Sequence, residues 1–435
     1  MRPALKAELV LGGAVLAHLV VVETMFFTAG AGRNGVLTVA KFFGLHVAAV
    51  MMVQLVLVAR LPWLDRRLGM DRLTAWHRWT GIALAWTIAT HATLVVLGFA
   101  RLDDAPVSDT FLSLAGVTDS LLGMCAAGII LVVVVLSTRL ARRRLPYEVF
   151  HAIHFCLYLA VALALAHQAL EGTTFTSSPL AAGYWWTVWA LVLVALVVGR
   201  VVVPIRRNLR HRFRVAAVVP EADDVVSVYV TGRDLHRFPA RAGQFCIWRF
   251  PAHFGWWQAN PFSLSAAPDG RGLRLTAKAV GTTSAGLRHL PVGSRALIEG
   301  PYGAFTPLQQ TTRATLLIAG GIGITPIRAL LEEVTHPTIA IYRVSSIADA
   351  VLLTELEALA IERGADLRVI AGRTGSGNPP IPPFDAGHLA AMVPDIEHRD
   401  VYVCGPPPMT EAVLSSLREL GVPRGQVHAE RFGLG

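Results

Sequence analysis

The sequence predicts a multidomain protein that consists of an all-α six-helix transmembrane bundle, then an antiparallel β-barrel, then a doubly wound α/β domain. The 435 residues are 53% hydrophobic and only 16% charged, which is too apolar for a wholly soluble protein. The chain is also too long for one ordinary domain. Its long apolar segments all begin before residue 205, and shorter runs rich in β-branched residues follow. We therefore expect the bundle at 1–208, the barrel at 209–309 and the α/β domain at 310–435.

Six apolar segments are each long enough to cross the ~30 Å hydrocarbon core of a bilayer as a helix. They lie near residues 9–29, 36–59, 74–99, 118–137, 149–170 and 184–204. The loops at 60–72, 139–144 and 206–214 are rich in arginine, whereas the alternate loops are acidic or neutral. The positive-inside rule then places both termini, and everything after Arg214, in the cytoplasm. We expect residues 1–30 to be retained as an anchor, because cleavage of a signal peptide there would break this alternation.

The net charge of +9 comes mostly from these loops. It therefore indicates a lipid bilayer as partner, and no nucleic acid is expected. The four cysteines are Cys125, Cys156, Cys246 and Cys404, and they show neither metal nor disulfide spacing. We interpret them as reduced structural thiols.

Four histidines in the third and fifth apolar segments predict a pair of haem sites. His77 and His154 lie near the starts of these segments, and His91 and His167 lie about 20 Å further along, at ~1.5 Å per residue. Both segments run in the same direction in the predicted topology, so one pair falls in each leaflet. Ionisable side chains inside a membrane mark functional sites, and imidazole is a haem ligand.

The helical phase of the fifth segment is less regular than that of the third. Fourteen steps from His77 to His91 place both rings on one face, but thirteen steps from His154 to His167 leave an offset of about 140°. The offset requires a π-bulge, a tightened turn or a ring geometry that tolerates offset ligation. Starting from His151 fits no better, so periodicity alone leaves His151 and His154 open.

The alternative for any one of these histidines is a polar core residue that pairs across the bundle. We favour that interpretation for His18, His46 and His151, which lack partners at matching depth. Lys41 is expected to be a snorkelling residue at the membrane interface.

Three stretches of the predicted barrel indicate a flavin site. They are Asn260-Pro261-Phe262-Ser263-Leu264-Ser265, Gly281-Thr282-Thr283-Ser284 and Gly300-Pro301-Tyr302-Gly303. A hydroxyl beside an aromatic ring can hydrogen-bond the edge of an isoalloxazine, and a glycine followed by hydroxyls lets backbone amides approach a pyrophosphate. Each stretch taken singly is also compatible with an ordinary turn.

From about residue 313 the pattern alternates strand and helix, which is typical of a doubly wound nucleotide-binding domain. Gly320-Gly321-Ile322-Gly323 follows an apolar strand and opens a helix, where a glycine turn can cradle a dinucleotide phosphate. Arg343 and Ser345 end the second strand, where the 2′-phosphate of NADPH would lie. This favours NADPH over NADH, and a solvated arginine in a surface turn is the alternative.

Together these residues resemble the NADPH oxidase and ferric reductase superfamily over essentially the whole chain. Its members fuse a six-helix bis-haem domain to a dehydrogenase of the ferredoxin-NADP reductase type, with an FAD-binding β-barrel and an NAD(P)-binding α/β domain. The resemblance implies that His77 and His91, with His154 and His167, are its haem ligands. It thereby favours His154 over His151.

The resemblance also implies roles for residues of the dehydrogenase. Asn260-Pro261-Phe262-Ser263 is similar to the His-Pro-Phe-Thr flavin motif, with Asn260 in place of the usual histidine. The stretch from Gly320 to Thr325 and Pro326 is similar to the GGxGxTP nucleotide motif. Cys404-Gly405-Pro406-Pro407-Pro408-Met409 resembles the CGPxxM motif that approaches nicotinamide, and Glu430-Arg431-Phe432 resembles a terminal ExF whose aromatic ring covers the flavin. The implied catalytic residues are Ser263, Cys404 and Phe432. We expect Phe432 to gate hydride transfer, and a simple core anchor is the alternative.

The function that this resemblance implies is transmembrane electron transfer in the plasma membrane. NADPH would reduce FAD, FAD would pass single electrons to two b-type haems, and the outer haem would reduce an extracytoplasmic small-molecule acceptor. Val95 stands where animal-type oxidases carry a further outer histidine, which favours ferric iron over dioxygen as the acceptor. Asp103, Asp104 and Asp109 offer carboxylates for ferric iron, although they are also what an ordinary outer loop contains.

A membrane haem carrier or sensor without enzymatic activity is the remaining alternative. The fused dehydrogenase argues against it, because a carrier needs none. The sequence shows neither an EF-hand loop nor a cytosolic regulatory extension. We therefore expect a constitutive enzyme without an obligate regulatory subunit.

Overall fold

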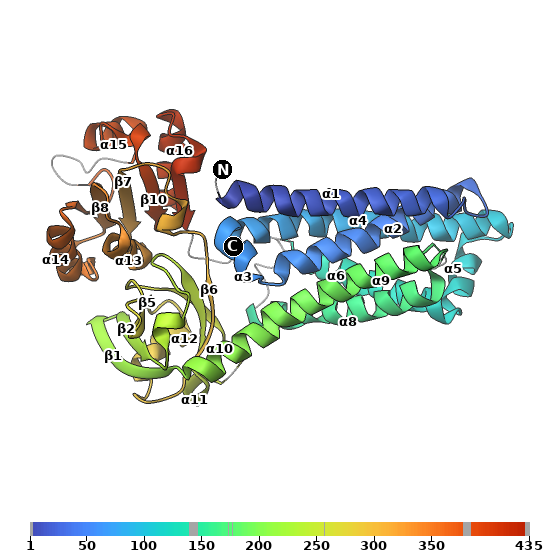
Figure 1. Cartoon of the computed structure of the whole chain (residues 1–435), viewed down its shortest axis with the longest axis horizontal. Coiled ribbons are helices and arrows are strands. Elements are labelled where there is room, and N and C mark those ends of the chain that lie inside the picture. Colours follow the sequence, from blue (N-terminus) through green and yellow to red (C-terminus); the bar gives the residue numbers. More distant parts are fainter. Residues whose placement is uncertain are drawn as a thin grey trace. The chain divides into compact units, whose positions relative to one another are not determined.

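The computed structural model describes residues 3–138, 147–172, 174–175, 177–255, 257–376 and 384–430. Figure 1 shows the chain. It divides into two compact units, which we call the helical unit (residues 5–61 and 71–200) and the C-terminal unit (mainly residues 62–70 and 201 onward). The basic loop at 139–144, the segment 431–435 and the side chain of His151 lie outside the described residues.

Six helices are long and apolar enough to cross a membrane, which confirms the six predicted segments. They run over Ala4–Thr28, Gly35–Val58, Arg72–Leu102, Thr118–Leu136, Ala152–Glu171 and Pro179–His211. The corresponding elements are α1 (Pro3–Thr28), α2 (Gly35–Val58), α4 (Met70–Leu102), α6 (Thr118–Leu136), α8 (Tyr147–Glu171) and α9 (Pro179–Val197). The last span continues through a π-helical turn, η1 (Val198–Val202), into α10 (Val203–His211).

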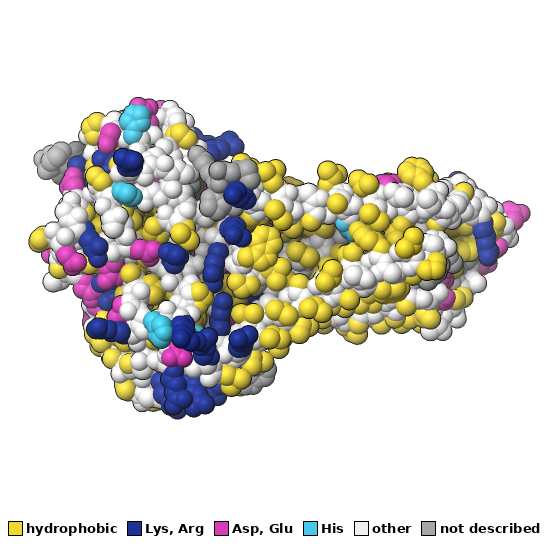
Figure 2. All heavy atoms as spheres, viewed as in Figure 1, with side chains coloured by type: hydrophobic (Ala, Val, Ile, Leu, Met, Phe, Trp, Pro, Cys, Tyr) yellow, Lys and Arg dark blue, Asp and Glu magenta, His cyan; other side chains and the backbone are white. Residues whose placement is uncertain are grey.

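The outward face of the helical unit is apolar, as a lipid-facing surface must be. Leu16, Trp86 and Leu180 are 64%, 72% and 87% exposed, and hydrophobic side chains cover the helices in Figure 2. Inside, Trp185 and Trp189 of α9 are buried, and both indole N–H groups donate to Oε1 of Gln168 on α8, at 3.3 and 3.1 Å. The unit is therefore an integral membrane bundle.

Two short helices were not predicted from the sequence. They are α3 (Pro62–Leu68), between the second and third spans, and α5 (Val107–Ala115), between the third and fourth. Helix α3 belongs to the C-terminal unit, where the buried carboxylate of Asp65 accepts a hydrogen bond from the backbone N–H of Gly303 at 3.0 Å. Both helices are shorter than three turns, so neither shows enough hydrophobic periodicity to be recognised.

The first half of the C-terminal unit is the predicted antiparallel barrel. Its strands are β1 (Arg214–Ala222), β2 (Val225–Thr231), β3 (Phe245–Arg249), β4 (Asn260–Ser263), β5 (Gly272–Lys278) and β6 (Leu297–Tyr302). They form two sheets, β1-β2-β5 and β4-β3-β6. Bridges between Leu264 and Leu275 and between Arg214 and Arg295 join the sheets at both edges. The barrel therefore closes in the order β1-β2-β5-β4-β3-β6.

The second half is a parallel five-stranded sheet of order β11-β10-β7-β8-β9. Its strands are β7 (Thr315–Gly320), β8 (Thr338–Val344), β9 (Asp366–Ala371), β10 (Asp400–Cys404) and β11 (Val427–Glu430). Alternate strand residues pack against helices on opposite faces. Leu317 packs with α13 (Ile324–Glu333) and α14 (Leu353–Arg363), and Leu316 packs with α15 (Ala386–Met392) and α16 (Pro407–Glu419). The strand order reverses between β7 and β10, so a ligand crevice is expected at their carboxyl ends.

Candidate functional site

The inner pair of histidines meets in the helical unit. The ring centroids of His77 on α4 and His154 on α8 are 6.2 Å apart, with 66° between the ring planes. Two imidazoles bound to opposite sides of one metal ion, through bonds of about 2 Å, hold their centroids roughly 6 Å apart. The Nδ1 atom of His77 is buried without a hydrogen-bond partner among the described residues. The spacing of this pair therefore fits a haem that His77 and His154 would hold between them.

The outer pair is oriented by backbone carbonyls. Nδ1 of His91 lies 2.9 Å from the carbonyl oxygen of Ala40 on α2, and Nδ1 of His167 lies 2.8 Å from that of Asp119 on α6. A proton on Nδ1 that is donated to a carbonyl leaves Nε2 as the metal-binding nitrogen. Both rings are therefore set in the tautomer that a haem ligand needs.

Two glycines make room for the outer histidines. A Cβ at Gly44 of α2 would lie 2.8 Å from Cε1 of His91, and a Cβ at Gly123 of α6 would lie 3.0 Å from Cε1, Cγ and Nδ1 of His167. Each glycine stands four residues after the residue whose carbonyl accepts from the histidine, which is Ala40 on α2 and Asp119 on α6. The same arrangement, a carbonyl that accepts from Nδ1 and a glycine one turn later against the ring, thus occurs once for each outer histidine. Neither glycine was predicted from the sequence, because a local pattern does not show which helix a histidine faces.

Helix α8 accommodates its histidines without a break. It is α-helical from Tyr147 to Glu171, so the π-bulge or tightened turn considered above is wrong. The offset between His154 and His167 is therefore left to the geometry of the rings. His167 turns toward α6, where it meets Asp119 and Gly123.

The first flavin stretch forms strand β4, which lies between β3 and the bridge to β5. Asn260 and Phe262 are half-buried and Pro261 is exposed. Ser263 is 5% exposed, and its hydroxyl has no hydrogen bond within the described residues. This hydroxyl is therefore available to a ligand.

The next residues of the same stretch are turned inward. Leu264 and Ser265 are fully buried. The hydroxyl of Ser265 accepts from Nε of Arg274 at 3.1 Å and from the Thr276 hydroxyl at 2.7 Å. It is therefore already engaged within the protein.

The second flavin stretch forms the N-terminus of α12 (Thr282–Gly286). Ser284 caps this turn, because its hydroxyl accepts from the N–H groups of Val280 and Gly281 at 3.0 and 3.1 Å. Gly281 has open space where a Cβ would stand. Thr282 is exposed and Thr283 is half-buried, so their hydroxyls remain for a pyrophosphate.

The two nucleotide motifs interlock at the crevice between β7 and β10. A Cβ at Gly323 would lie 2.3 Å from the carbonyl oxygen of Cys404, and one at Gly320 would lie 2.5 Å from Sδ of Met409. The turns that follow the two strands can therefore approach each other only because these positions are glycine. Gly321 is left-handed (φ 52°) and faces open space, as a phosphate-binding turn requires.

The neighbouring motif residues are placed as follows. Thr325 and Pro326 are buried, and the Thr325 hydroxyl donates to the carbonyl of Ile322 at 3.1 Å. Cys404 and Gly405 are buried, whereas Pro406 is exposed. Burial raises the pKa of the Cys404 thiol well above its ordinary value, so the thiol stays protonated. Phe432 lies outside the described residues.

The candidate 2′-phosphate residues stand at the end of β8. Arg343 is half-buried, donates from Nη2 to the Thr374 hydroxyl at 3.0 Å and stacks 5.9 Å from the ring centroid of Phe384. Ser345 is exposed. The side chain of Arg343 is thus held at the carboxyl end of β8 by Thr374 and Phe384.

Comparisons with known proteins assign all three parts of the chain. Residues 43–165 match the family described as ferric reductase like transmembrane component, residues 210–306 match an FAD-binding domain, and residues 317–415 match an oxidoreductase NAD-binding domain. The chain belongs to the NADPH oxidase and ferric reductase superfamily. It is therefore an oxidoreductase with FAD- and NAD-binding domains fused to a membrane domain.

Individual relatives of this superfamily member match parts of its chain. It is 30% identical over 242 residues to the reductase component of propane 2-monooxygenase from Mycolicibacterium goodii, covering 51% of this chain and 67% of that one. It is 26% identical over 314 residues to a flavohemoprotein from Xylella fastidiosa (strain 9a5c), covering 68% and 78%. The solved FAD/NAD-binding domain of nitric oxide dioxygenase from Vibrio cholerae O1 biovar El Tor is 24% identical, with a TM-score of 0.43 and coverage of 52% and 99%. The chain spans about two thirds of the propane monooxygenase reductases.

In this superfamily member an ionic network ties β5 and the end of the Asn260–Ser265 stretch to the nucleotide-binding domain. Arg274 of β5 is 4% exposed and lies 2.9 Å from both carboxylate oxygens of Glu355 on α14. Arg328 of α13 contacts the same carboxylate at 2.8 Å. Both guanidinium groups also donate to the carbonyl of Ser265, at 2.6 and 3.2 Å. No local pattern in the sequence indicates this network, because Arg274, Arg328 and Glu355 come from three separate elements.

The network also sets the charge of Glu355. Burial by itself disfavours the ionised carboxylate, but the hydrogen bonds and charges of Arg274 and Arg328 outweigh it and hold the pKa of Glu355 below its usual range. Glu355 is therefore ionised at neutral pH. It bridges two arginines that both hold the end of the flavin motif.

The outer loop of this superfamily member does not gather a metal site. Asp103, Asp104 and Asp109 are exposed, and no group of three or more His, Cys, Asp or Glu side chains within the described residues is placed to hold a metal ion. The suggestion that these aspartates jointly bind ferric iron is therefore wrong for the described structure. Val95 is half-buried on α4, one turn after His91.

Proposed function

We propose that this protein carries electrons from cytoplasmic NADPH across the membrane to an extracytoplasmic small-molecule acceptor. The observation that supports this most strongly is the presence of two histidine pairs, at two depths of a six-helix bundle, in the same chain as an FAD- and NAD-binding reductase. A haem carrier or sensor would use the histidines but not the dehydrogenase. The two features together therefore favour an electron-transfer enzyme.

Different residues of the site would bind FAD and the nicotinamide nucleotide. The strand Asn260–Ser263 and the turn at Gly281 would hold FAD, and the interlocked turns at Gly320–Gly323 and Cys404–Pro406 would hold the nicotinamide nucleotide. The Ser263 hydroxyl would orient the flavin, and the protonated Cys404 thiol would approach the nicotinamide as a neutral group. FAD, when bound, would supply the conversion of hydride into single electrons, and two b-type haems would supply one-electron carriers.

The membrane histidines would hold the haems at fixed positions. His77 and His154 bring two imidazoles to the spacing that one iron requires. His91 and His167 present Nε2, because Nδ1 of each is used by a backbone carbonyl. The positive-inside loops support a cytoplasmic dehydrogenase, and in that orientation the second pair would lie toward the outer face of the plasma membrane.

Two finer points rest on single residues. Arg343, together with Ser345, supports NADPH over NADH, because a guanidinium beside a hydroxyl suits the 2′-phosphate dianion. Phe432 is proposed to cover the flavin and to move when nicotinamide binds, on the strength of the terminal ExF resemblance.

The acceptor is proposed to be a ferric chelate, with dioxygen as the second candidate. Val95 supports the first, because it replaces the additional outer histidine of animal-type oxidases. The exposed aspartates do not form an iron site, so a ferric acceptor would react as a chelate in contact with the outer surface. Dioxygen would be supported if NADPH oxidation matched oxygen consumption and ferric chelates neither competed nor accelerated turnover.

The test is a comparison of His91→Ala with His18→Ala in the purified full chain. His91→Ala should lose one of two haems and acceptor reduction while NADPH still bleaches the flavin absorbance. His18 lies in α1, where its Nδ1 pairs with the Tyr184 hydroxyl at 2.8 Å, so His18→Ala should keep both haems. Retention of two haems and full acceptor reduction in His91→Ala would overturn the assignment.

A further inference from the structure

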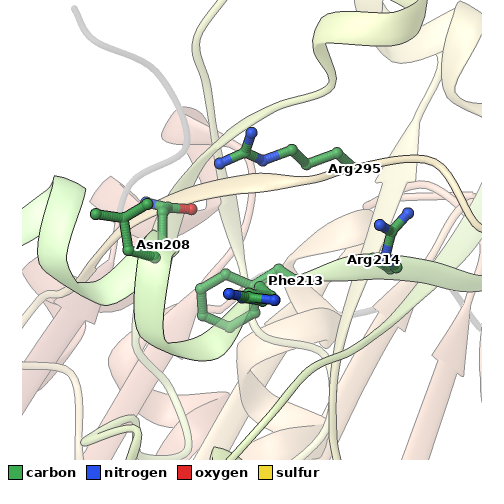
Figure 3. A pocket seen from close by; sticks show the side chains of 6 residues that line it. Asn208, Phe213, Arg214 and Arg295 are labelled. Carbon is green, nitrogen blue, oxygen red and sulfur yellow. The ribbon is translucent and has the colours of Figure 1, made fainter.

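A basic pocket lies where the last membrane helix joins the barrel. The cavity has a volume of about 260 Å³ and is lined by Asn208, Leu209, Arg212, Phe213, Arg214 and Arg295. Figure 3 shows that Arg214 and Arg295 come from different parts of the barrel and flank the end of α10, which carries Asn208. Arginine and lysine side chains also gather around α10 on the surface in Figure 2. None of the six lining residues is acidic.

The walls of the pocket are held rigidly. The side-chain amide of Asn208 pairs with the backbone of Ile298 on β6, donating to its carbonyl at 2.8 Å and accepting from its N–H at 2.9 Å. Phe213 is 1% exposed and forms the floor. Arg214 and Arg295 are bridge partners at the seam of the barrel, which fixes the backbone from which both side chains start.

The three arginines of the pocket carry uncompensated charge. Arg212, Arg214 and Arg295 are exposed, and none of them forms an ion pair with a described residue. Arg214 donates once, from Nη1 to the carbonyl of Gly293 at 2.7 Å. Arg210, which lies just outside the pocket, is by contrast 3.8 Å from the carboxylate of Asp234. Three like charges around one cavity favour an anion, and planar guanidinium groups suit the oxygens of a phosphate.

The pocket is separate from the flavin motif Asn260–Ser265. It lies at the seam between β1 and β6, whereas the flavin motif lies on β4. In the closed order β1-β2-β5-β4-β3-β6, strand β4 is three places from β1, which is the opposite side of the barrel. The pocket therefore does not belong to the β4 part of the flavin site.

The apolar part of the pocket indicates where the anion comes from. Leu209 lines the cavity and is 63% exposed, and Ile205, one turn earlier, is 53% exposed. Both belong to α10, the helix that continues directly from the last candidate membrane span. We propose that this pocket binds the phosphate of an anionic phospholipid headgroup, with the acyl chains against Leu209 and Ile205. Basic pockets beside membrane helices bind such headgroups through the same combination.

A lipid in this position would link two segments of the chain, and we call this link the clamp. Its phosphate would be shared between Arg212 at the end of the membrane helix and Arg295 before β6, two segments that are 83 positions apart in the sequence. The clamp would hold the exit of the last span against the barrel. This inference does not depend on which acceptor the enzyme reduces.

The experiment titrates the full FAD- and haem-loaded chain, in neutral detergent, with three probes. These are dihexanoyl phosphatidylglycerol, dihexanoyl phosphatidylcholine and inorganic phosphate, each followed by native mass spectrometry. Arg212→Gln and Arg295→Gln should each weaken phosphatidylglycerol binding about fivefold, and the double variant about 25-fold. Arg313→Gln is the matched control, because Arg313 is exposed at the start of the nucleotide-binding domain and lies outside the pocket.

The outcomes separate the sources of the anion. Tight binding of phosphatidylglycerol that phosphatidylcholine and phosphate do not match supports the proposal. Equal affinity for inorganic phosphate would overturn it in favour of a soluble anion, and equal affinity of the control and pocket variants would show that the lipid binds elsewhere. Arg212→Lys with Arg295→Lys keeps the charge, so it should retain most of the binding, and flavin content checks the folding of every variant. Loss of binding in this charge-conserving variant equal to that in the glutamine pair would also contradict the proposal.

Discussion

Replacing Gly44 with alanine should move His91 out of its ligand position. The new Cβ would lie 2.8 Å from Cε1 and 3.0 Å from Nδ1 of the His91 ring, whereas non-bonded carbon atoms prefer a separation of about 3.5 Å or more. The ring cannot escape by turning, because the Ala40 carbonyl holds Nδ1 at 2.9 Å. The imidazole must therefore shift by several tenths of an ångström. We expect outer-haem affinity to fall by a factor on the order of 10 to 100, the range for lost support of a metal-binding histidine.

The assay measures haem per flavin in the purified full chain, together with NADPH-driven reduction of the flavin and of the acceptor. Gly44→Ala should lower haem content toward half and slow acceptor reduction, while flavin reduction stays at the wild-type rate. Gly128→Ala is the control, since a Cβ at Gly128 of α6 meets nothing within 4 Å. Both changes replace a helical glycine with alanine, which by itself stabilises a helix by about 1 kcal/mol. Their difference therefore isolates the contact with His91.

Gly123→Ala provides an internal repeat of the test. Its Cβ would lie 3.0 Å from three ring atoms of His167, so the effect should have the same direction and a smaller size. If Gly44→Ala matched Gly128→Ala in haem content, optical spectrum and acceptor reduction, the close packing of glycine on His91 would have no role in haem binding, and our reasoning would be refuted.

Three further predictions concern the dehydrogenase. Glu355→Gln should lower the thermal stability of the flavin-loaded protein near pH 7. Because the folded pKa of Glu355 lies below its ordinary value of 4.5, the carboxylate stabilises the protein fully above that value, and the stability gap to wild type should close only as the pH falls below it, through the folded pKa. A difference in thermal stability between Glu355→Gln and wild type that did not change with pH would contradict the proposed role of these ion pairs. Arg343→Ala should raise KM for NADPH and leave KM for NADH unchanged in steady-state kinetics, and an unchanged NADPH preference would exclude a role for Arg343. Alkylation of Cys404 and Cys246 in the native protein should remain slow from about pH 7 to 9 by mass spectrometry, because burial raises the pKa of both thiols, that of Cys246 to about 12. Rapid labelling that increased with pH would show that these thiols ionise.

Much of the fold was readable from the sequence because it depends on patterns within single elements. Six apolar segments predicted six spans, since length and hydropathy are local properties of a helix. The alternation of strands and helices after residue 313 predicted the parallel sheet, since each buried strand must be covered by helices. The short helices α3 and α5 were missed because a few residues carry too little periodicity.

The candidate site was only partly readable. Spacing identified the four histidines, but it also suggested an irregularity in α8 that the continuous helix does not have. Spacing does not reveal which way an imidazole turns, and His167 turns toward α6. The aspartates of the outer loop are close in sequence, yet they do not gather as metal ligands within the described structure.

The sequence by itself determined the residue types, their depth along each span and the order of the three parts. Only the tertiary structure decided which groups meet: Gly44 under His91, Glu355 between Arg274 and Arg328, and Arg212 beside Arg214 and Arg295. The physical reason is that periodicity records how an element presents its faces to its surroundings. A contact between distant elements depends instead on which of those faces pack together, on backbone direction and on side-chain rotamers, none of which a local pattern encodes.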